Sequence, residues 1–208
     1  MRFENEVLPG WLNVSRETFS KLVEFSNLVE KWNPAINLVS KGGVADLWQR
    51  HVIDSAQLVF HIPEDAALYC DLGSGGGFPG IIMAVLAEEF VPEMHVVLVE
   101  SDRRKSVFLA EAARHLGISP VIKTERIQDL APQNADVLTA RALAPFSELC
   151  GLASRHLRSS GLALFPKGAN AQQELQVAQV GWLFDHTEIP SRTNPDAVIF
   201  SVRNIRHA

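Results

Sequence analysis

A glycine-rich stretch, DLGSGGGFPG from Asp71 to Gly80, is the part of this sequence best suited to hold a small ligand. Glycine lets the backbone take positive φ values and approach a ligand closely, because it carries no Cβ. Asp71 precedes the glycines, and a second acidic residue, Glu100, follows Gly80 by 20 positions. A carboxylate at that distance can accept hydrogen bonds from the hydroxyl groups of a ribose. The pattern therefore indicates a site for a nucleoside-containing ligand.

Two cofactor classes fit this glycine spacing. Gly75-x-Gly77-x-x-Gly80 matches the dinucleotide fingerprint, in which a pyrophosphate lies at the N-terminus of a helix. Asp71-x-Gly73-x-Gly75-x-Gly77 matches the methyltransferase form of the loop, which surrounds the amino-acid end and the ribose of S-adenosylmethionine. Asp71 favours the second class, since a carboxylate there would orient an ammonium group and repel a pyrophosphate. Without a ligand, the stretch would be only a glycine-rich turn.

Strands that alternate with helices must position this loop, and from Leu68 onward the pattern is typical of a parallel sheet with crossover helices. Strands are expected over residues 68–72, 95–100, 121–124, 137–140, 162–165, 182–189 and 197–203. The last two should form an antiparallel edge. The helix before them should turn Leu175, Val177 and Ala178 inward. Ligands of such sheets bind beyond the carboxyl ends of the strands, so we expect one crevice there.

The N-terminal part reads as helical. An amphipathic helix is expected over residues 15–33, with Ser15 as its N-cap and Pro34 as its end, and a second helix over residues 44–59. His51 and Asp54 are three positions apart and share a side of the second helix, either as an acid–base pair or as hydrogen-bonding residues that fasten these helices to the core. We therefore divide the chain into a helical extension, residues 1–64, packed on a core, residues 65–208.

Composition bounds the remaining possibilities. The 208 residues are 47% hydrophobic and 21% charged, which suits one medium-sized domain with a small extension. No apolar run approaches the ~20 residues of a membrane span, and MRFENEVLPG lacks a signal-peptide pattern, so we expect a cytoplasmic protein without membrane attachment. Cys70 and Cys150 lack the spacing of a metal site or a disulfide framework and suit small buried side chains.

The net charge of −5 argues against a non-specific nucleic-acid binder, because phosphate neutralisation supplies most of the affinity of such proteins. Basic residues nevertheless recur along the second half of the chain. They are Arg103, Arg104, Lys105, Lys123, Arg126, Arg155, Arg158, Lys167, Arg192, Arg203 and Arg206. If these residues are scattered over solvated faces, they do not indicate a nucleic-acid partner. If they lie together, they could form a local basic rim for one.

Several motifs follow one another in the order of a known family and cover most of the chain from about residue 32 to residue 167. They are Trp32-Asn33 with Asn37-Leu38, Arg50-His51-x-x-Asp54-Ser55, DLGSGGGFPG from Asp71, ESDRRKSVFL from Glu100, TARALAP from Thr139 and FPKG from Phe165. On these motifs the chain resembles the ribosomal small-subunit methyltransferase G family, also called glucose-inhibited division protein B. That family methylates N7 of a guanosine in 16S ribosomal RNA.

The resemblance implies an α/β, Rossmann-like class I S-adenosylmethionine-dependent methyltransferase fold, with a mostly parallel sheet, an antiparallel C-terminal edge and an N-terminal helical extension. It implies cofactor contacts from Asp71, Gly73, Gly75, Gly77, Phe78, Glu100, Ile127, Gln128 and Arg141. The family's usual small-then-acidic pair at the adenine is replaced by Ile127-Gln128, which leaves recognition of the base to the backbone. Phe78 would pack on the cofactor or fix the loop to the core.

Asn37, Arg141 and Lys167 are the positioning candidates that the resemblance supplies near the reacting groups. Arg141 could instead pair with Asp71 or Glu148, and Lys167 could be a solvated lysine at a strand end. Guanine N7 carries a free lone pair, so no catalytic base should be required. The enzyme would work by aligning the reacting atoms and by excluding water.

The expected partner is 16S ribosomal RNA, as naked RNA or within the assembled small subunit, and the expected state is a monomer without a metal. Two other functions fit parts of the pattern. A small NAD(P)-dependent oxidoreductase would share the glycine loop, but Asp71 and the lack of a Tyr-x-x-x-Lys pair oppose it, since the only tyrosine is Tyr69. A non-catalytic module that has lost its ligand is opposed by the intact loop and by Glu100.

Overall fold

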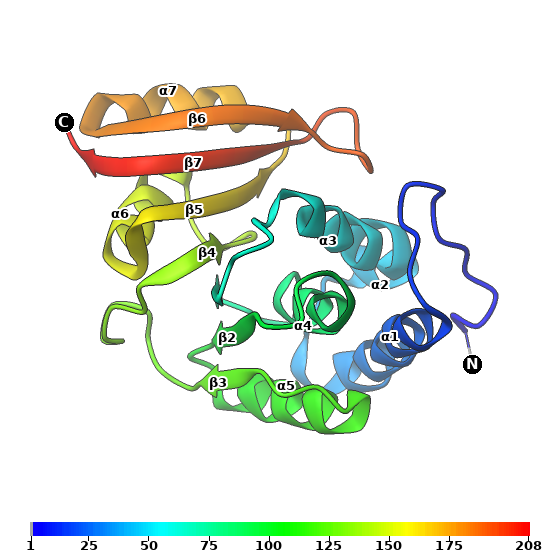
Figure 1. Cartoon of the computed structure of the whole chain (residues 1–208). Coiled ribbons are helices and arrows are strands. Elements are labelled where there is room, and N and C mark those ends of the chain that lie inside the picture. The colour runs from blue at the N-terminus through cyan, green and yellow to red at the C-terminus, as the bar shows by residue number, and fades with distance from the viewer. Residues whose placement is uncertain (1) are drawn as a thin grey trace.

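The computed structural model describes residues 2–208, and in this part of the chain seven strands form one sheet in the order β3-β2-β1-β4-β5-β7-β6 (Figure 1). β1 to β5 are parallel to one another, and β7 lies antiparallel between β5 and β6. The parallel sheet with an antiparallel C-terminal edge is therefore confirmed. The strands are β1 Leu68–Leu72, β2 His95–Val99, β3 Val121–Lys123, β4 Ala135–Thr139, β5 Leu157–Lys167, β6 Trp182–Pro190 and β7 Val198–His207.

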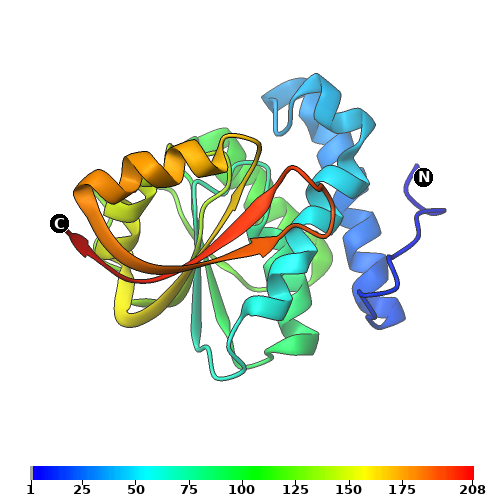
Figure 2. The same cartoon turned by 90° about the horizontal axis from the view of Figure 1, so that it is seen from above.

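Helices cover both faces of this sheet. The N-terminal helices, α4 and α5 lie on one face, and α6 and α7 lie on the other (Figures 1 and 2). The helical segments are α1 Arg16–Ile36, α2 Lys41–Ala45, a π-helix Trp48–Ile53, α3 Asp54–Ala56, a 3₁₀ helix Gln57–His61, α4 Gly80–Phe90, α5 Arg103–Leu116, α6 Phe146–His156 and α7 Ala171–Gly181.

The core divides along the sheet because successive strand side chains point to opposite faces. Tyr69 of β1 joins the cluster under α1 and α4, whereas Cys70 and Leu72 join the cluster under α6 and α7. Cys70 and Cys150 are free thiols, and burial raises the pKa of each to about 12. Both therefore behave as small buried apolar side chains.

Two details of the helices differ from the sequence-based prediction. Pro34 does not end α1, since the helix continues to Ile36. Asn37 forms the C-cap: its backbone is left-handed at φ 50°, and its N–H donates to Asn33 O. Val177 is not turned inward in α7 and is 59% exposed. It lies two positions from Leu175, and two helical positions are about 200° apart around the axis.

The expected single helix over residues 44–59 is a chain of short segments of different helical type. In the π-helix at its centre, the N–H of Asp54 donates to Gln49 O, one residue further back than in an α-helix. This change of winding is not visible in apolar periodicity. It brings Arg50 and Asp54 to the carboxyl edge of the sheet, as described below.

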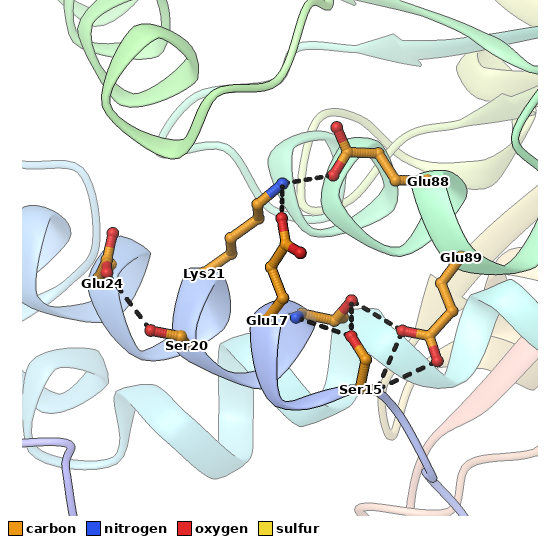
Figure 3. Close-up of polar contacts among 8 residues, drawn as sticks. Ser15, Glu17, Ser20, Lys21, Glu24, Glu88 and Glu89 are labelled. Atoms are coloured by element: carbon orange, nitrogen blue, oxygen red, sulfur yellow. Dashed lines mark hydrogen bonds and ion pairs between the residues drawn. The ribbon is translucent and has the colours of Figure 1, made fainter.

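Two carboxylates of α4 fasten α1 to the core (Figure 3). Glu89 accepts hydrogen bonds from the backbone N–H of Ser15 at 3.1 Å and from the hydroxyl of Thr18 at 2.7 Å. Glu88 accepts from Lys21 Nζ at 2.6 Å. These bonds fix the first turn of α1 against the end of α4, while the apolar stripe of α1 is buried beneath it.

Ser15→Ala is expected to lower the free energy of unfolding by about 1 kcal/mol. The Ser15 hydroxyl accepts the N–H of Thr18 at 3.1 Å and so satisfies one free donor at the start of α1. Ser20→Ala is the matched control, since Ser20 is exposed one turn further along the same helix. Urea denaturation measures both, and equal stability of the two variants would contradict a capping role for Ser15.

Candidate active site

The glycine loop runs from the carboxyl end of β1 to the start of α4. Gly73, Gly75 and Gly77 have φ values of 71°, 53° and 88°. The N–H groups of Gly73 and Ser74 donate to Val99 O at 2.9 and 3.0 Å, which ties the loop to the end of the neighbouring strand. The loop therefore starts where β1 and β2 both end, at the edge where parallel sheets bind ligands.

One side of this loop is packed and the other is open. A Cβ on Gly76 would lie 2.8 Å from Leu38 O, and a Cβ on Gly77 would lie 2.8 Å from the Phe25 ring. At Gly75 the only heavy atom that a Cβ would meet is Gly73 O, at 3.7 Å, among the described residues. The N-terminal extension thus supplies the floor of the loop, and Gly75 faces free space.

That space is a cavity of about 410 Å³. It falls within the size range of small-molecule sites, about 300–1,000 Å³. Polar and apolar groups share its lining about equally. The residues are Leu38, Val39, His51, Gly73, Ser74, Gly75, Gly76, Phe78, Val99, Glu100, Ser101, Lys105, Ile127, Arg141, Ala142 and Leu143.

Glu100 stands at the end of β2 with its carboxylate against the loop. Its Oε2 accepts the N–H of Gly75 at 2.8 Å, and its Oε1 accepts the N–H of Asp102 at 2.7 Å. Each carboxylate oxygen has a second lone pair, so Glu100 can still accept hydrogen bonds from a ligand. The geometry fits a ribose bound above Gly75.

Asp71 lies beneath the loop rather than in the cavity wall. Its Oδ1 accepts the Thr139 hydroxyl at 2.8 Å, and that hydroxyl also lies 2.7 Å from the Tyr69 hydroxyl. Its Oδ2 is buried without a hydrogen-bond partner among residues 2–208, and it lies 2.6 Å from the place that a Cβ on Gly80 would take. Burial raises the pKa of Asp71 to about 6, against the opposing effect of the Thr139 hydrogen bond.

We expect the buried Asp71 to make the free energy of unfolding depend on pH. Its pKa is about 6 in the folded chain and near 4 in the unfolded one, so the folded state binds the proton more tightly. The contribution of Asp71 to stability is therefore largest below about pH 4 and falls by roughly 2–3 kcal/mol as the pH rises to about 6. Asp71→Asn should remove this slope. Urea unfolding of both proteins at about pH 4.5 and about pH 6.5 measures it, and parallel behaviour would contradict the prediction.

The remaining expected cofactor residues divide into two groups. Phe78 and Ile127 line the cavity, and the Phe78 ring also packs against the rings of Phe25 and His51, each with a centroid separation of 5.2 Å. Gly77 is packed in the loop floor, and Gln128 is exposed in the turn after β3, outside the lining. The cofactor role of each remains a prediction.

Arg141 follows β4 and joins two cavities. It lines the 410 Å³ cavity and a neighbouring one of about 670 Å³. Its Nη2 donates to Arg50 O at 2.7 Å and lies 3.6 Å from Asp54 Oδ2, so its ion-pair partner is Asp54 rather than Asp71 or Glu148. Its buried Nη1 has no hydrogen-bond partner within the described part of the chain.

The two other positioning candidates lie outside the smaller cavity. Lys167 lines the larger one, where its Nζ donates to Ala144 O at 3.0 Å and to Glu174 Oε2 at 2.8 Å. Asn37 is exposed at the C-terminus of α1, next to Leu38 of the smaller cavity. Lys167 is thus a fixed cation in the wall of the larger cavity, and Asn37 stands beside the mouth of the smaller one.

The rRNA small subunit methyltransferase G family matches residues 18–197. A ribosomal RNA small subunit methyltransferase G of Ruegeria pomeroyi is 52% identical over 194 residues, which cover 93% of this chain and 95% of that protein. The chain belongs to the ribosomal RNA small subunit methyltransferase G family.

Solved structures agree on the fold of this family member. A SAM-dependent methyltransferase from Corynebacterium glutamicum matches with a TM-score of 0.58 and 15% identity over 88% of this chain and 98% of that one. TYW2 of M. jannaschii, solved in complex with AdoMet, matches with a TM-score of 0.51 and 13% identity over 82% and 78%. The strand order differs from that of a dinucleotide-binding oxidoreductase. The sheet of such an oxidoreductase ends in the order 4-5-6, whereas β7 lies between β5 and β6 here.

Sequence reasoning missed ten of the residues that line the smaller cavity of this methyltransferase G family member, among them Leu38, His51 and Lys105. Leu38 and Lys105 lay inside recognised motifs without a cofactor role, and His51 was considered only as a partner of Asp54. Burial, together with Arg141 and Arg50, lowers the pKa of His51 to about 4, so its imidazole is neutral at physiological pH. Asp54 instead accepts hydrogen bonds from Gln57 and Thr193.

Proposed function

We propose that this protein transfers the methyl group of S-adenosylmethionine to N7 of a guanosine in 16S ribosomal RNA. The observation that carries the proposal is the pair of adjoining cavities at the carboxyl edge of the sheet. The two share Arg141, Ala142 and Leu143 as a common wall. A cofactor in one and a nucleobase in the other would therefore lie side by side, as methyl transfer requires.

The smaller cavity is the proposed cofactor site. S-adenosylmethionine, when bound, supplies a methyl group that is already activated on a sulfonium. Glu100 would accept the ribose hydroxyls, and Ile127 would pack against the adenine while the backbone of the turn reads its edge. The side chain of Gln128 is exposed, which suits recognition of the adenine by the backbone rather than by this side chain. Gly73, Gly75 and Gly77 let the backbone approach, and the neutral His51 adds no positive charge near a cationic ligand.

The larger cavity is the proposed guanosine site. Its wall is rich in side-chain amides and hydroxyls, which can pair with the polar edges of guanine. These residues are Gln49, Gln57, Asn170, Gln173, Ser191, Thr193 and Asn194. Arg50, Arg141 and Lys167 lie in the same wall beside the carboxylates of Asp54 and Glu174, which leaves a small excess of positive charge for a phosphate backbone in a chain of net charge −5. Asn37 would meet the RNA at the neighbouring mouth.

This reaction asks for no proton transfer before attack, because guanine N7 already presents a lone pair. The side chains around the cavities suit positioning: Arg141 is held by Arg50 O and Asp54, and Lys167 is held by Glu174. Their task would be to hold the guanine in line with the methyl group and to keep water out.

The proposal extends to the organisation and setting of the protein. Residues 1–64 would act as a helical extension that completes the loop floor of the core, residues 65–208. The enzyme would work as a monomer in the cytoplasm, on naked 16S RNA or on the assembled small subunit. Among residues 2–208, no helix is long and apolar enough to cross a membrane, and no group of three or more His, Cys, Asp or Glu side chains could hold a metal ion.

The test is methyl transfer from radiolabelled S-adenosylmethionine to unmodified 16S RNA, offered both as naked transcript and within small subunits that lack the modification. Mass spectrometry of nuclease digests identifies the product, and cleavage at N7-methylguanosine maps the position. We expect one N7-methylguanosine per RNA. Labelling of another base or atom, or binding of NADH in place of S-adenosylmethionine, would overturn the proposal.

A further inference from the structure

The carboxylate of Asp54 lies between Arg141 and the turn that joins β6 to β7. Its Oδ2 is 3.6 Å from Arg141 Nη2, and its Oδ1 accepts the hydroxyl of Thr193 at 2.6 Å. The side chains of Asp54 and Arg141 are 17% and 19% exposed, so their charges are partly shielded from water. One carboxylate thus contacts three separate parts of the chain: the helical extension, the end of β4 and the C-terminal hairpin.

Gln57, one turn further along, repeats the attachment to the same hairpin turn. Its side-chain carbonyl accepts the N–H of Arg192 at 2.8 Å, and its amide donates to Ser191 Oγ at 3.2 Å. The Arg192 guanidinium lies 5.3 Å from the centroid of the Trp11 ring. Figure 2 shows this turn beside the helical extension, across the edge of the sheet. The turn over residues 191–194 is therefore held by contacts to the extension rather than by its own hairpin alone.

Most residues of this contact set line the larger cavity. Arg50, Asp54, Gln57, Arg141 and the turn over residues 191–194, except Arg192, line it. Arg141 Nη2 is taken up by Arg50 O and Asp54, while its buried Nη1 is left without a partner among the described residues. Because Nη2 makes both of these contacts, the guanidinium is held in one place and Nη1 remains as a donor for a ligand.

We propose that Asp54 is a positioning residue for the RNA substrate: its two oxygens hold the Arg141 guanidinium and the 191–194 turn in one arrangement and so form the guanosine-facing wall. The inference rests on the proposed function, since it assigns the larger cavity to RNA. Asp54 itself does not touch the reacting atoms. It acts through Arg141 on one side and through Thr193 on the other.

Asp54→Asn separates the contact of Asp54 with Arg141 from its contact with Thr193. An asparagine carbonyl can still accept the Thr193 hydroxyl, but the negative charge opposite Arg141 is lost and an N–H donor can face the guanidinium. We expect the KM for RNA to rise about ten-fold, because a displacement of a positioning group by about 1 Å is costly. The KM for S-adenosylmethionine should rise less than the KM for RNA, because Asp54 and the 191–194 turn lie at the larger cavity and only Arg141 lines both cavities.

Glu89→Gln is the matched control. Glu89 also fastens the N-terminal extension to the core through several hydrogen bonds, but its contacts are with Ser15 and Thr18, away from both cavities. If Asp54 served only to attach the extension, both variants would lose melting temperature and neither would change the KM for RNA. An unchanged KM for RNA in Asp54→Asn would overturn the proposal.

A double-mutant cycle with Arg141→Met, which removes the charge that Asp54 faces, tests whether Asp54 acts through Arg141. The readout is the Kd for fluorescently labelled 16S RNA, which does not require turnover. We expect Asp54→Asn to weaken RNA binding in the wild-type background and to change it by less than about two-fold in the Arg141→Met background. Equal effects in both backgrounds would show that the two residues are independent and would overturn the proposal.

Thr193→Val tests the contact between Asp54 and the 191–194 turn, and the measurement needs no RNA. The valine cannot donate to Asp54 Oδ1, so the turn should open more often and trypsin should cleave after Arg192 faster than in the wild type. Unchanged cleavage would overturn the role of Asp54 in holding the turn. If the wild-type protein methylates no RNA, the proposed function itself has failed. If the wild type and Glu89→Gln methylate RNA while Asp54→Asn equals them, only the positioning role has failed.

Discussion

Gly75→Leu is expected to abolish binding of S-adenosylmethionine, with a loss of at least about 100-fold in affinity, while the protein stays folded. The side chain would start in free space above the loop, because a Cβ at Gly75 meets only Gly73 O at 3.7 Å within the described structure. It would therefore fill the smaller cavity rather than disturb the core. Calorimetric titration with S-adenosylmethionine measures the loss.

Gly117→Leu is the control for backbone strain at Gly75. Gly117 ends α5 at φ 67°, close to the 53° of Gly75, and a Cβ there meets no heavy atom of the described residues within 4 Å. Both substitutions cost about 1–2 kcal/mol because they place a side chain in the left-handed region. Only Gly75→Leu should lose the cofactor. Equal affinities in the two variants would exclude the cavity above Gly75 as the cofactor site.

Glu100→Gln is expected to weaken S-adenosylmethionine binding by about 30- to 100-fold. Both carboxylate oxygens accept backbone N–H groups, from Gly75 and from Asp102. The glutamine amide can accept only one of these and turns its own donors toward the other. The loop would lose one of its ties to β2, and the ribose would lose its acceptor.

Asp102→Asn provides a matched change from carboxylate to amide two residues away. Asp102 caps α5 by accepting the N–H groups of Arg104 and Lys105, and asparagine is an equally good N-cap. We expect cofactor affinity in this variant to stay within about two-fold of the wild type. The assignment of Glu100 would be wrong if the two variants bound S-adenosylmethionine equally.

The sheet and the glycine loop could be predicted from local pattern, because each depends on residues close together in sequence. β1 lies at the predicted residues, and β2, β3, β4 and β6 lie within two residues of their predicted ranges, whereas β5 begins five residues earlier and β7 ends four residues later than predicted. Glu100 also reached its predicted place, since a residue at the carboxyl end of one parallel strand lies beside the loop after its neighbour. Strand period and topology decide such positions.

The partners of the charged groups could not be predicted in the same way. Asp71 and Glu148 were the ion-pair partners considered for Arg141 as the alternative to a positioning role, yet its ion-pair partner is Asp54, 87 positions earlier. That contact depends on a π-helical segment, and apolar periodicity does not reveal a change in helical winding. Asp71 is likewise covered by its own loop rather than exposed in the cavity wall. Long-range packing decides both outcomes.

Because the N-terminal extension packs beneath the glycine loop, we expect the parts on either side of residue 64 to fold together rather than independently. Phe25 and Leu38 support Gly77 and Gly76 from below, and α1 shares one apolar cluster with α4 and α5. Residues 65–208 expressed alone would expose that cluster to water and lose the support beneath the glycines. The two parts should therefore melt in a single transition, and the core is not a module that truncation or domain exchange could separate from its extension.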